Sequence, residues 1–199
     1  MLSLVDAEVL VLSLSLTAVD VLSLSLTTVE VLSLSLTTVD VLRRAGVEVD
    51  TVSIQETKTV TTSHGISLQA DKLFDEVDYT EKDMIVLPGG SVGTENLDAH
   101  EGVKEVVRQF IKASKYVAAI CAAPSILGKM GYLEGKKAVA HPSMTQFLYG
   151  AKVQDDPAVR DGYIITGQAM AASLEFALLI LESMEGKAAV DKVCEGIVR

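Results

Sequence analysis

Short apolar runs alternate with amphipathic segments over most of the chain after Gly46. A continuous apolar run bounded by turn residues is typical of a parallel strand that is buried on both faces. Apolar residues three and four positions apart instead mark one face of a helix. Strands are predicted at 47–54, 84–87, 116–120, 137–140 and 162–166, with a hairpin at 58–62 and 65–69. Helices are predicted at 100–114, 122–130, 173–185 and 187–197. This alternation predicts an α/β fold with a mostly parallel sheet between two helical layers.

The first 40 residues carry a different pattern, a repeat of ten residues. The copies at 11–20, 21–30 and 31–40 read VLSLSLTAVD, VLSLSLTTVE and VLSLSLTTVD. The alternation of Leu and Ser favours a strand, although Leu22, Leu26 and Val29 also have helical spacing. Identical strands with no Gly or Pro between them are prone to misregister and aggregation. A low-complexity extension therefore fits the repeats better than a functional array of strands.

Composition and charge exclude several classes of partner. The chain has 199 residues, 49% of them hydrophobic and 22% charged, which indicates one globular domain, alone or with an appendage. The net charge of −10 argues against a nucleic-acid partner, because phosphates are held by basic stripes. The longest uncharged run of the repeats, 9–19, is too short to span a membrane and follows no basic segment, so neither a membrane partner nor a secretory signal is expected. Two cysteines without ligand spacing suit a reducing cytoplasm.

Cys121 is the strongest candidate for chemistry. It stands between a predicted strand and a predicted helix, and so at the carboxyl edge of the sheet, where open α/β folds place their sites. We expect the sharp turn to expose the sulfur, as in a nucleophile elbow, and the helix amino terminus to lower the thiol pKa. The alternative is a buried cysteine that only packs.

Glycines and histidines supply the other candidates. Gly89 and Gly90 follow the strand at 84–87, and the main-chain N–H groups there could hold an oxyanion or a carboxylate. Ser91 interrupts a dinucleotide-binding glycine pattern, and the glycines before Lys136 are spaced one residue too closely for a phosphate loop.

Of the three histidines, His141 is a possible acid or base beside Cys121, with a structural loop residue as the alternative. His64, at a hairpin tip, and His100, in the first turn of a helix, have no chemical role on spacing alone. No cluster has metal-ligand spacing, so no metal is expected.

Several motifs occur in the order of a known family. They are V-D-V-L-R-R-A-G (39–46), V-L-P-G-G (86–90), A-A-I-C-A-A-P (118–124), A-H-P (140–142) and E-F-A-L (175–178). Together they resemble the ThiJ/PfpI superfamily, in the branch of the Parkinson-associated protein deglycase and glyoxalase III. The resemblance covers residues 37–199. It implies a flavodoxin-like three-layer sandwich, a homodimer and no cofactor.

The resemblance also implies a site and a range of activities. Cys121 would be the nucleophile and His141 would lie near it, with an anion pocket formed by main-chain N–H groups at Gly89, Gly90 and Ala122. The family's S-R-G hairpin tip, which reaches the partner subunit's site, is S-H-G here, so His64 replaces an Arg. Family activities include conversion of methylglyoxal to lactate, repair of early glycation adducts, redox sensing and chaperone-like behaviour. The expected substrate is a small reactive carbonyl or a glycated molecule.

Two departures from the family pattern bear on activity. The family has a Glu that hydrogen-bonds the cysteine, and a gapless alignment places Leu34 at its position. A second hypothesis is that Glu30, one helical turn earlier, substitutes for it after a shift of register. Ala169, Met170 and Ala171 replace the family's G-P-G. A Leu cannot carry a proton, so we expect a glyoxalase III or deglycase-type hydro-lyase or hydrolase with reduced activity.

Two other functions stay open. One is a non-catalytic chaperone or redox sensor of the stress response that uses Cys121. The other is a relative of the cysteine hydrolases and amidotransferases, for which the chain shows no convincing Cys-His-acid triad.

The family fold also gives the repeats a place. The sheet needs a first strand and a helix before Gly46, and 21–26 and 31–45 fit them. Residues 21–199 then form one domain, and 1–20 are a surplus repetitive extension that could be disordered.

Overall fold

The computed structural model describes residues 19–23, 29–61 and 66–199, with side chains among them from Ser35 onward. Within these ranges the main sheet has seven strands in the order β10-β11-β7-β6-β1-β2-β5. All neighbours pair in parallel except β10 and β11, which are antiparallel. The strands are β1 (Val19–Ser23), β2 (Val49–Ser53), β5 (Lys72–Leu73), β6 (Met84–Leu87), β7 (Tyr116–Ile120), β10 (Ala158–Asp161) and β11 (Ile164–Gly167).

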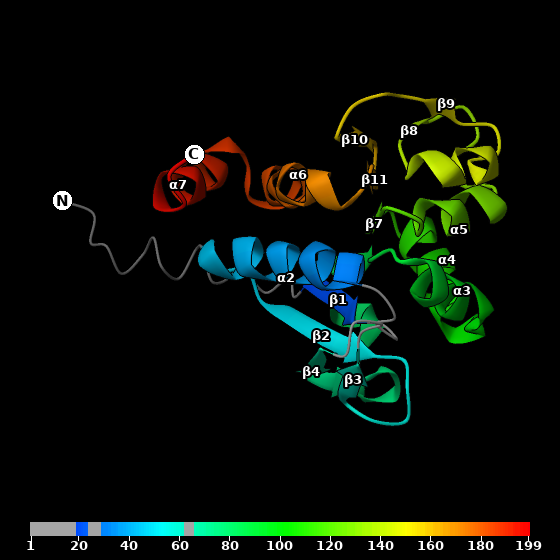
Figure 1. Ribbon diagram of the computed structural model, residues 1–199, viewed down its shortest axis with the longest axis horizontal. Helices are drawn as coiled ribbons and strands as arrows, with labels where there is room; N and C mark the ends of the chain where they lie inside the picture. Colours follow the sequence, from blue (N-terminus) through cyan, green and yellow to red (C-terminus); the bar gives the residue numbers. More distant parts are fainter. Residues whose placement is uncertain (1–18, 24–28, 62–65) are drawn as a thin grey trace.

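Helices cover both faces of this sheet, which confirms the predicted three-layer α/β architecture (Figure 1). One layer holds α2 (Val29–Arg44), α6 (Ser173–Glu185) and α7 (Lys187–Gly196). The other holds α3 (Ser91–Ala99), α4 (Glu101–Lys112) and α5 (Pro124–Lys129). Two small sheets, β3 (Thr59–Thr61) with β4 (Ser67–Gln69) and β8 (Lys137–Ala138) with β9 (Lys152–Val153), lie outside the main sheet.

The central strands show why continuous apolar runs mark this architecture. In β6, Met84 and Val86 pack with α2 and α6, whereas Ile85 and Leu87 pack with the α4 and α5 layer. All four side chains are 2% exposed or less. Because successive side chains of a strand point to opposite faces, every position of a strand between two helical layers is buried, which favours apolar residues.

The repeats enter the fold at β1 and α2. The strand covers Val19–Ser23, so it begins earlier than the predicted 21–26, and residues 24–26 lie outside the described chain. β1 pairs with both β2 and β6, which makes it a central strand. The predicted helix at 31–45 is observed as α2, which packs against α6. The predicted extension at 1–20 lies outside the described residues except for Val19 and Asp20.

Several elements differ from their predicted forms. The predicted helix at 122–130 is shorter, because α5 begins only at Pro124 after a turn. In α4 the buried side includes Phe110, while the predicted Ile111 is only partly buried. The patterns missed α3, β5, β9 and β10, as well as four 3-10 helices, namely η1 (Phe74–Glu76), η2 (Tyr79–Glu81), η3 (Pro142–Phe147) and η4 (Met170–Ala172).

Candidate functional site

Cys121 lies at the carboxyl edge of the sheet, directly after β7, in a left-handed backbone conformation with φ of 64°. Few residues other than Gly adopt this conformation, and an outlier of this kind costs about 1–3 kcal/mol unless its surroundings hold it in place. Two main-chain hydrogen bonds do so: Cys121 N donates to Gly167 O at 3.0 Å, and Cys121 O accepts from His141 N at 2.8 Å. Strain held at a strand-to-helix turn is a feature of nucleophile elbows.

Gly89 lies directly against this turn. A Cβ at position 89 would be 2.5 Å from Cys121 Cβ, 2.6 Å from Ile120 O and 3.0 Å from Ala122 N. Only a residue without a side chain permits such an approach. Since β6 and β7 are parallel neighbours, their carboxyl ends meet at the same edge, and the segment after β6 lies on the turn after β7. Gly89 and Ala122 are thereby brought together with Cys121.

Gly90 and Ala122 begin the two segments that lead away from this edge. Gly90 has φ of 90° and is the N-cap of α3, with its carbonyl accepting from Thr94 N at 2.9 Å. Ala122 is 4% exposed and lies in the turn before α5. A helix amino terminus has N–H groups without intrahelical partners, and these groups bind anionic oxygens.

The turn does not open Cys121 widely to solvent. The residue is 3% exposed, so the prediction that the turn exposes the sulfur is wrong for this chain. The physical reason is the close approach of Gly89 and the burial of Ala122 and Ala123 beside it.

His141 reaches Cys121 through the main chain. It follows β8 and is the N-cap of η3, where Met144 N donates to His141 O at 2.7 Å. The segment before it is fixed by a buried hydrogen bond from Val139 N to Thr166 Oγ1 at 2.9 Å. Cys121 and His141 are thus neighbours, as expected, although the chemical role of each stays a prediction.

Ser143 was missed by the sequence patterns. Its hydroxyl lies 2.8 Å from His141 Nδ1, and its main-chain N donates to the same ring nitrogen at 3.3 Å. The signal that could have found it is the order His-Pro-Ser. A polar N-cap followed by Pro at the first helical position predicts a side chain that accepts from the N–H two residues on.

The remaining candidates have a limited structural description. His64 lies outside the described residues. Positions 30 and 34 are one turn apart in α2, in the part whose side chains the structure does not describe. In place of the family's G-P-G, Ala169 is extended and η4 leads into α6, where Ser173 Oγ donates to Met170 O at 2.5 Å.

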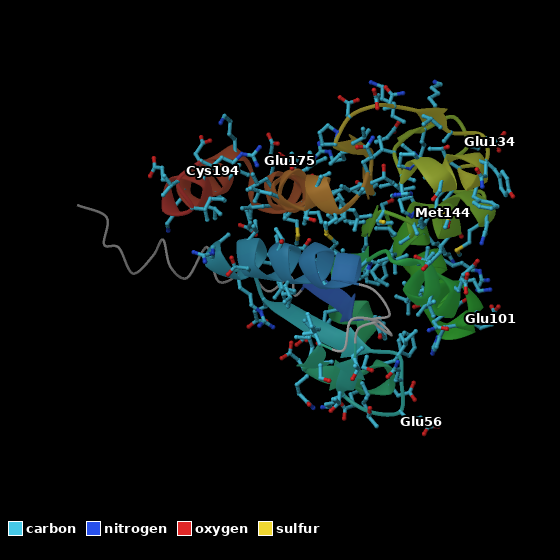
Figure 2. All side chains as sticks on the ribbon, in the orientation of Figure 1. Glu56, Glu101, Glu134, Met144, Glu175 and Cys194 are labelled. Atoms are coloured by element: carbon cyan, nitrogen blue, oxygen red, sulfur yellow. The ribbon has the colours of Figure 1, made fainter. Side chains whose placement is uncertain are left out.

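The second cysteine lies elsewhere. Cys194 is on α7, at the opposite side of the molecule from Met144 in η3 (Figure 2). Both cysteines are free thiols. No group of three or more His, Cys, Asp or Glu side chains in the described chain is placed to hold a metal. None of its helices is long and apolar enough to cross a membrane.

A carboxylate with a strongly lowered pKa lies at the amino edge of the sheet. Asp50 Oδ2 accepts from Lys72 Nζ at 2.7 Å and from Lys82 Nζ at 2.9 Å. Desolvation raises the pKa of Asp50, but the hydrogen bonds and charges of the two lysines outweigh it and lower the pKa to about 2. Asp50 is the second residue of β2, so this cluster lies at the amino ends of the strands. The candidate site lies at the opposite edge of the sheet, where the strands have their carboxyl ends.

Comparison with known proteins gives one consistent match. The model of the DJ-1/PfpI family matches residues 20–183. Protein dj-1beta of Drosophila melanogaster is 33% identical over 157 residues, which cover 78% of this chain and 84% of that protein. The glutathione-independent glyoxalase DJ-1 of Schizosaccharomyces pombe is 30% identical over 154 residues, covering 72% and 80%. The crystal structure of Drosophila DJ-1beta superposes with a TM-score of 0.83 at 31% identity, covering 92% of this chain and 97% of that one.

Proposed function

The chain belongs to the DJ-1/PfpI family, and from that premise we propose that it is a cysteine-dependent, cofactor-free enzyme that converts small reactive carbonyls. The observation that carries the proposal is the left-handed turn at Cys121, which Gly89 packs against and a hydrogen bond from His141 N holds in place. A relative of similar length is a glutathione-independent glyoxalase, so a glyoxalase or deglycase activity is the first to test.

The proposed reaction needs no external oxidant. The thiolate of Cys121 adds to the aldehyde carbon of methylglyoxal, and the hydrogen on that carbon leaves as a proton and returns to the neighbouring carbon. The aldehyde carbon is thereby oxidised and the ketone carbon reduced. Water then hydrolyses the lactoyl thioester to lactate and the free thiol. Main-chain N–H groups near Gly90 and Ala122 are suited to bind the oxyanion of the first step.

Proton transfer is the weak point of this chain. The family resemblance implies that position 34, which lies in α2 and holds a Leu, is the position of the proton-carrying Glu. General acid–base help contributes about 10²–10⁴ in rate. We therefore propose reduced activity, with Glu30 as the substitute acid if activity remains. In that case Glu30→Gln abolishes lactate formation and Leu34→Ala leaves it unchanged. Lactate formation that survives Glu30→Gln excludes Glu30 as the acid.

The proposed assembly is a homodimer in the cytoplasm. Residues 62–65, which include His64, lie outside the described chain between β3 and β4. The family resemblance implies that His64 stands where the family has an Arg that reaches the partner subunit's site. Sedimentation of the purified chain tests the dimer. A monomer at micromolar concentration excludes a role of His64 across subunits.

The test of catalysis is lactate formation from methylglyoxal by the purified chain, with Cys121→Ala and Cys194→Ser as matched variants. We expect low activity that Cys121→Ala abolishes and Cys194→Ser preserves, because Cys194 lies on α7, away from the site. Activity that survives Cys121→Ala contradicts the proposal.

The replacement at position 34 also favours a second candidate function. A chain that keeps the cysteine turn without the acid suits a redox sensor or a chaperone of the stress response. Its signature is peroxide oxidation of Cys121, seen by mass spectrometry, in a protein that produces no lactate.

A further inference from the structure

Ser143 contacts the ring of His141 in two ways, and the main-chain contact defines which ring nitrogen is protonated. Ser143 N donates to His141 Nδ1 at 3.3 Å, and Ser143 Oγ lies 2.8 Å from the same nitrogen. A main-chain N–H can only donate, so Nδ1 must offer a lone pair. The hydroxyl then also donates to Nδ1, and the single proton of the neutral imidazole is on Nε2.

We propose that the main-chain N–H of Ser143 fixes His141 as the Nε2–H tautomer. The neutral ring then acts at the site as a hydrogen-bond donor through Nε2 and has no free lone pair with which to remove a proton. The action on substrate rests on the proposed function above, whereas the tautomer itself does not.

The backbone on both sides of the His141 ring is held by hydrogen bonds. His141 N donates to Cys121 O at 2.8 Å, and Met144 N donates to His141 O at 2.7 Å. Pro142, the first residue of η3, has a fixed φ, so the direction from His141 to Ser143 is restricted. A second hydroxyl of the same turn, Thr145 Oγ1, donates to Pro142 O at 3.0 Å and has no part in the ring contact.

This tautomer bears on the missing acid. A donor at Nε2 suits an oxygen that gains negative charge when a thiolate adds to a carbonyl. It does not suit the next step, in which a base must take the proton from carbon. His141 therefore cannot replace the carboxylate that is missing at position 34. Stabilisation of the oxyanion and removal of the proton from carbon depend on different groups.

The experiment is a two-bond ¹H–¹⁵N correlation spectrum of the uniformly ¹⁵N-labelled full chain above the pH at which its histidines are protonated. An unprotonated ring nitrogen resonates far downfield of a protonated one, so the spectrum gives the tautomer of each histidine. His100 is an internal reference, because its Nδ1 accepts from Val103 N at 3.2 Å without a hydroxyl. Assignment uses His141→Asn, which removes one set of signals.

We expect Nε2–H at His141 in the unmodified chain and also in Ser143→Ala, because the main-chain N–H that selects this tautomer remains and a hydroxyl can either donate to Nδ1 or accept from it. Ser143→Thr and Thr145→Ala keep the same tautomer. The pattern of His100 is the same in all variants. An Nδ1–H tautomer at His141 in the unmodified chain or in Ser143→Ala overturns the proposal. If the tautomer is as expected but no carbonyl is converted, the assignment of the tautomer stands and the proposed function fails.

Discussion

His141 N donates a hydrogen bond to Cys121 O at 2.8 Å, so the two candidate residues are joined by main-chain atoms. On the other side, Cys121 N donates to Gly167 O at 3.0 Å. Neither contact uses a side chain of the site. Substitutions at Cys121 and His141 can therefore change the chemistry while the backbone that carries it stays in place.

Two substitutions of the N-cap residue His141 distinguish its effect on stability from its effect on catalysis. Asn accepts well from the first N–H groups of a helix, whereas Ala cannot. We expect His141→Ala to lower the free energy of unfolding by about 1 kcal/mol and His141→Asn to leave it nearly unchanged. In a Leu34→Glu background, both variants lower kcat/KM for methylglyoxal by about 10²-fold, because the ring's hydrogen-bond donor to the oxyanion is lost. Urea unfolding and lactate assays measure the two effects, and full activity in either variant excludes a chemical role for the ring.

Gly89→Ala tests the close approach to Cys121. The new Cβ would lie 2.5 Å from Cys121 Cβ and 2.6 Å from Ile120 O, so backbone must move. Overpacking of this kind lowers the free energy of unfolding by about 1–3 kcal/mol. Gly196→Ala is the control, because a Cβ at that exposed position of α7 meets no atom within 4 Å. It should stabilise by about 0.5–1 kcal/mol, since Gly is a poor helix former. Equal effects of Gly89→Ala and Gly196→Ala on the thermal unfolding temperature would contradict the close packing of Gly89 against Cys121.

The buried hydrogen bond from Val139 N to Thr166 Oγ1 fixes the segment between β8 and His141. Both residues are at most 1% exposed. Thr166→Val keeps the shape but leaves a buried N–H without an acceptor, which costs about 1–3 kcal/mol. Thr166→Ser keeps the acceptor and loses one methyl group, at about 1 kcal/mol. Denaturant unfolding should give Thr166→Val a lower free energy of unfolding than Thr166→Ser. The opposite order would show that this hydrogen bond does not stabilise the segment before His141.

Asp50 predicts a pH dependence of stability. Its pKa in the folded chain, about 2, is below the ordinary 3.8, so its contribution is complete above pH 3.8 and is lost as the pH falls toward 2. We expect Asp50→Asn to lower the free energy of unfolding by about 2 kcal/mol at neutral pH. The difference from the unmodified chain should narrow below pH 4. Asp191→Asn, in an exposed pair with Lys187, should have no measurable effect at either pH.

The sequence predicted the fold and part of the site for a definite reason. Buried strands and amphipathic helices are local patterns, and the edge at which parallel strands end follows from their order, so Gly89 and Cys121 could be placed together. The tautomer of His141 could not be predicted, because it depends on the distances to Ser143. The burial of Cys121 was also missed, since it depends on how closely the segment after β6 approaches the turn after β7.

The most direct test compares lactate formation from methylglyoxal by the unmodified chain, Leu34→Glu, and Leu34→Glu with Cys121→Ala. The account holds that fold and cysteine turn are intact and that only the acid of α2 is missing. It predicts that Leu34→Glu raises kcat/KM by about 10²-fold or more and that Cys121→Ala abolishes the gain. Equal activity of the unmodified chain and Leu34→Glu would contradict it.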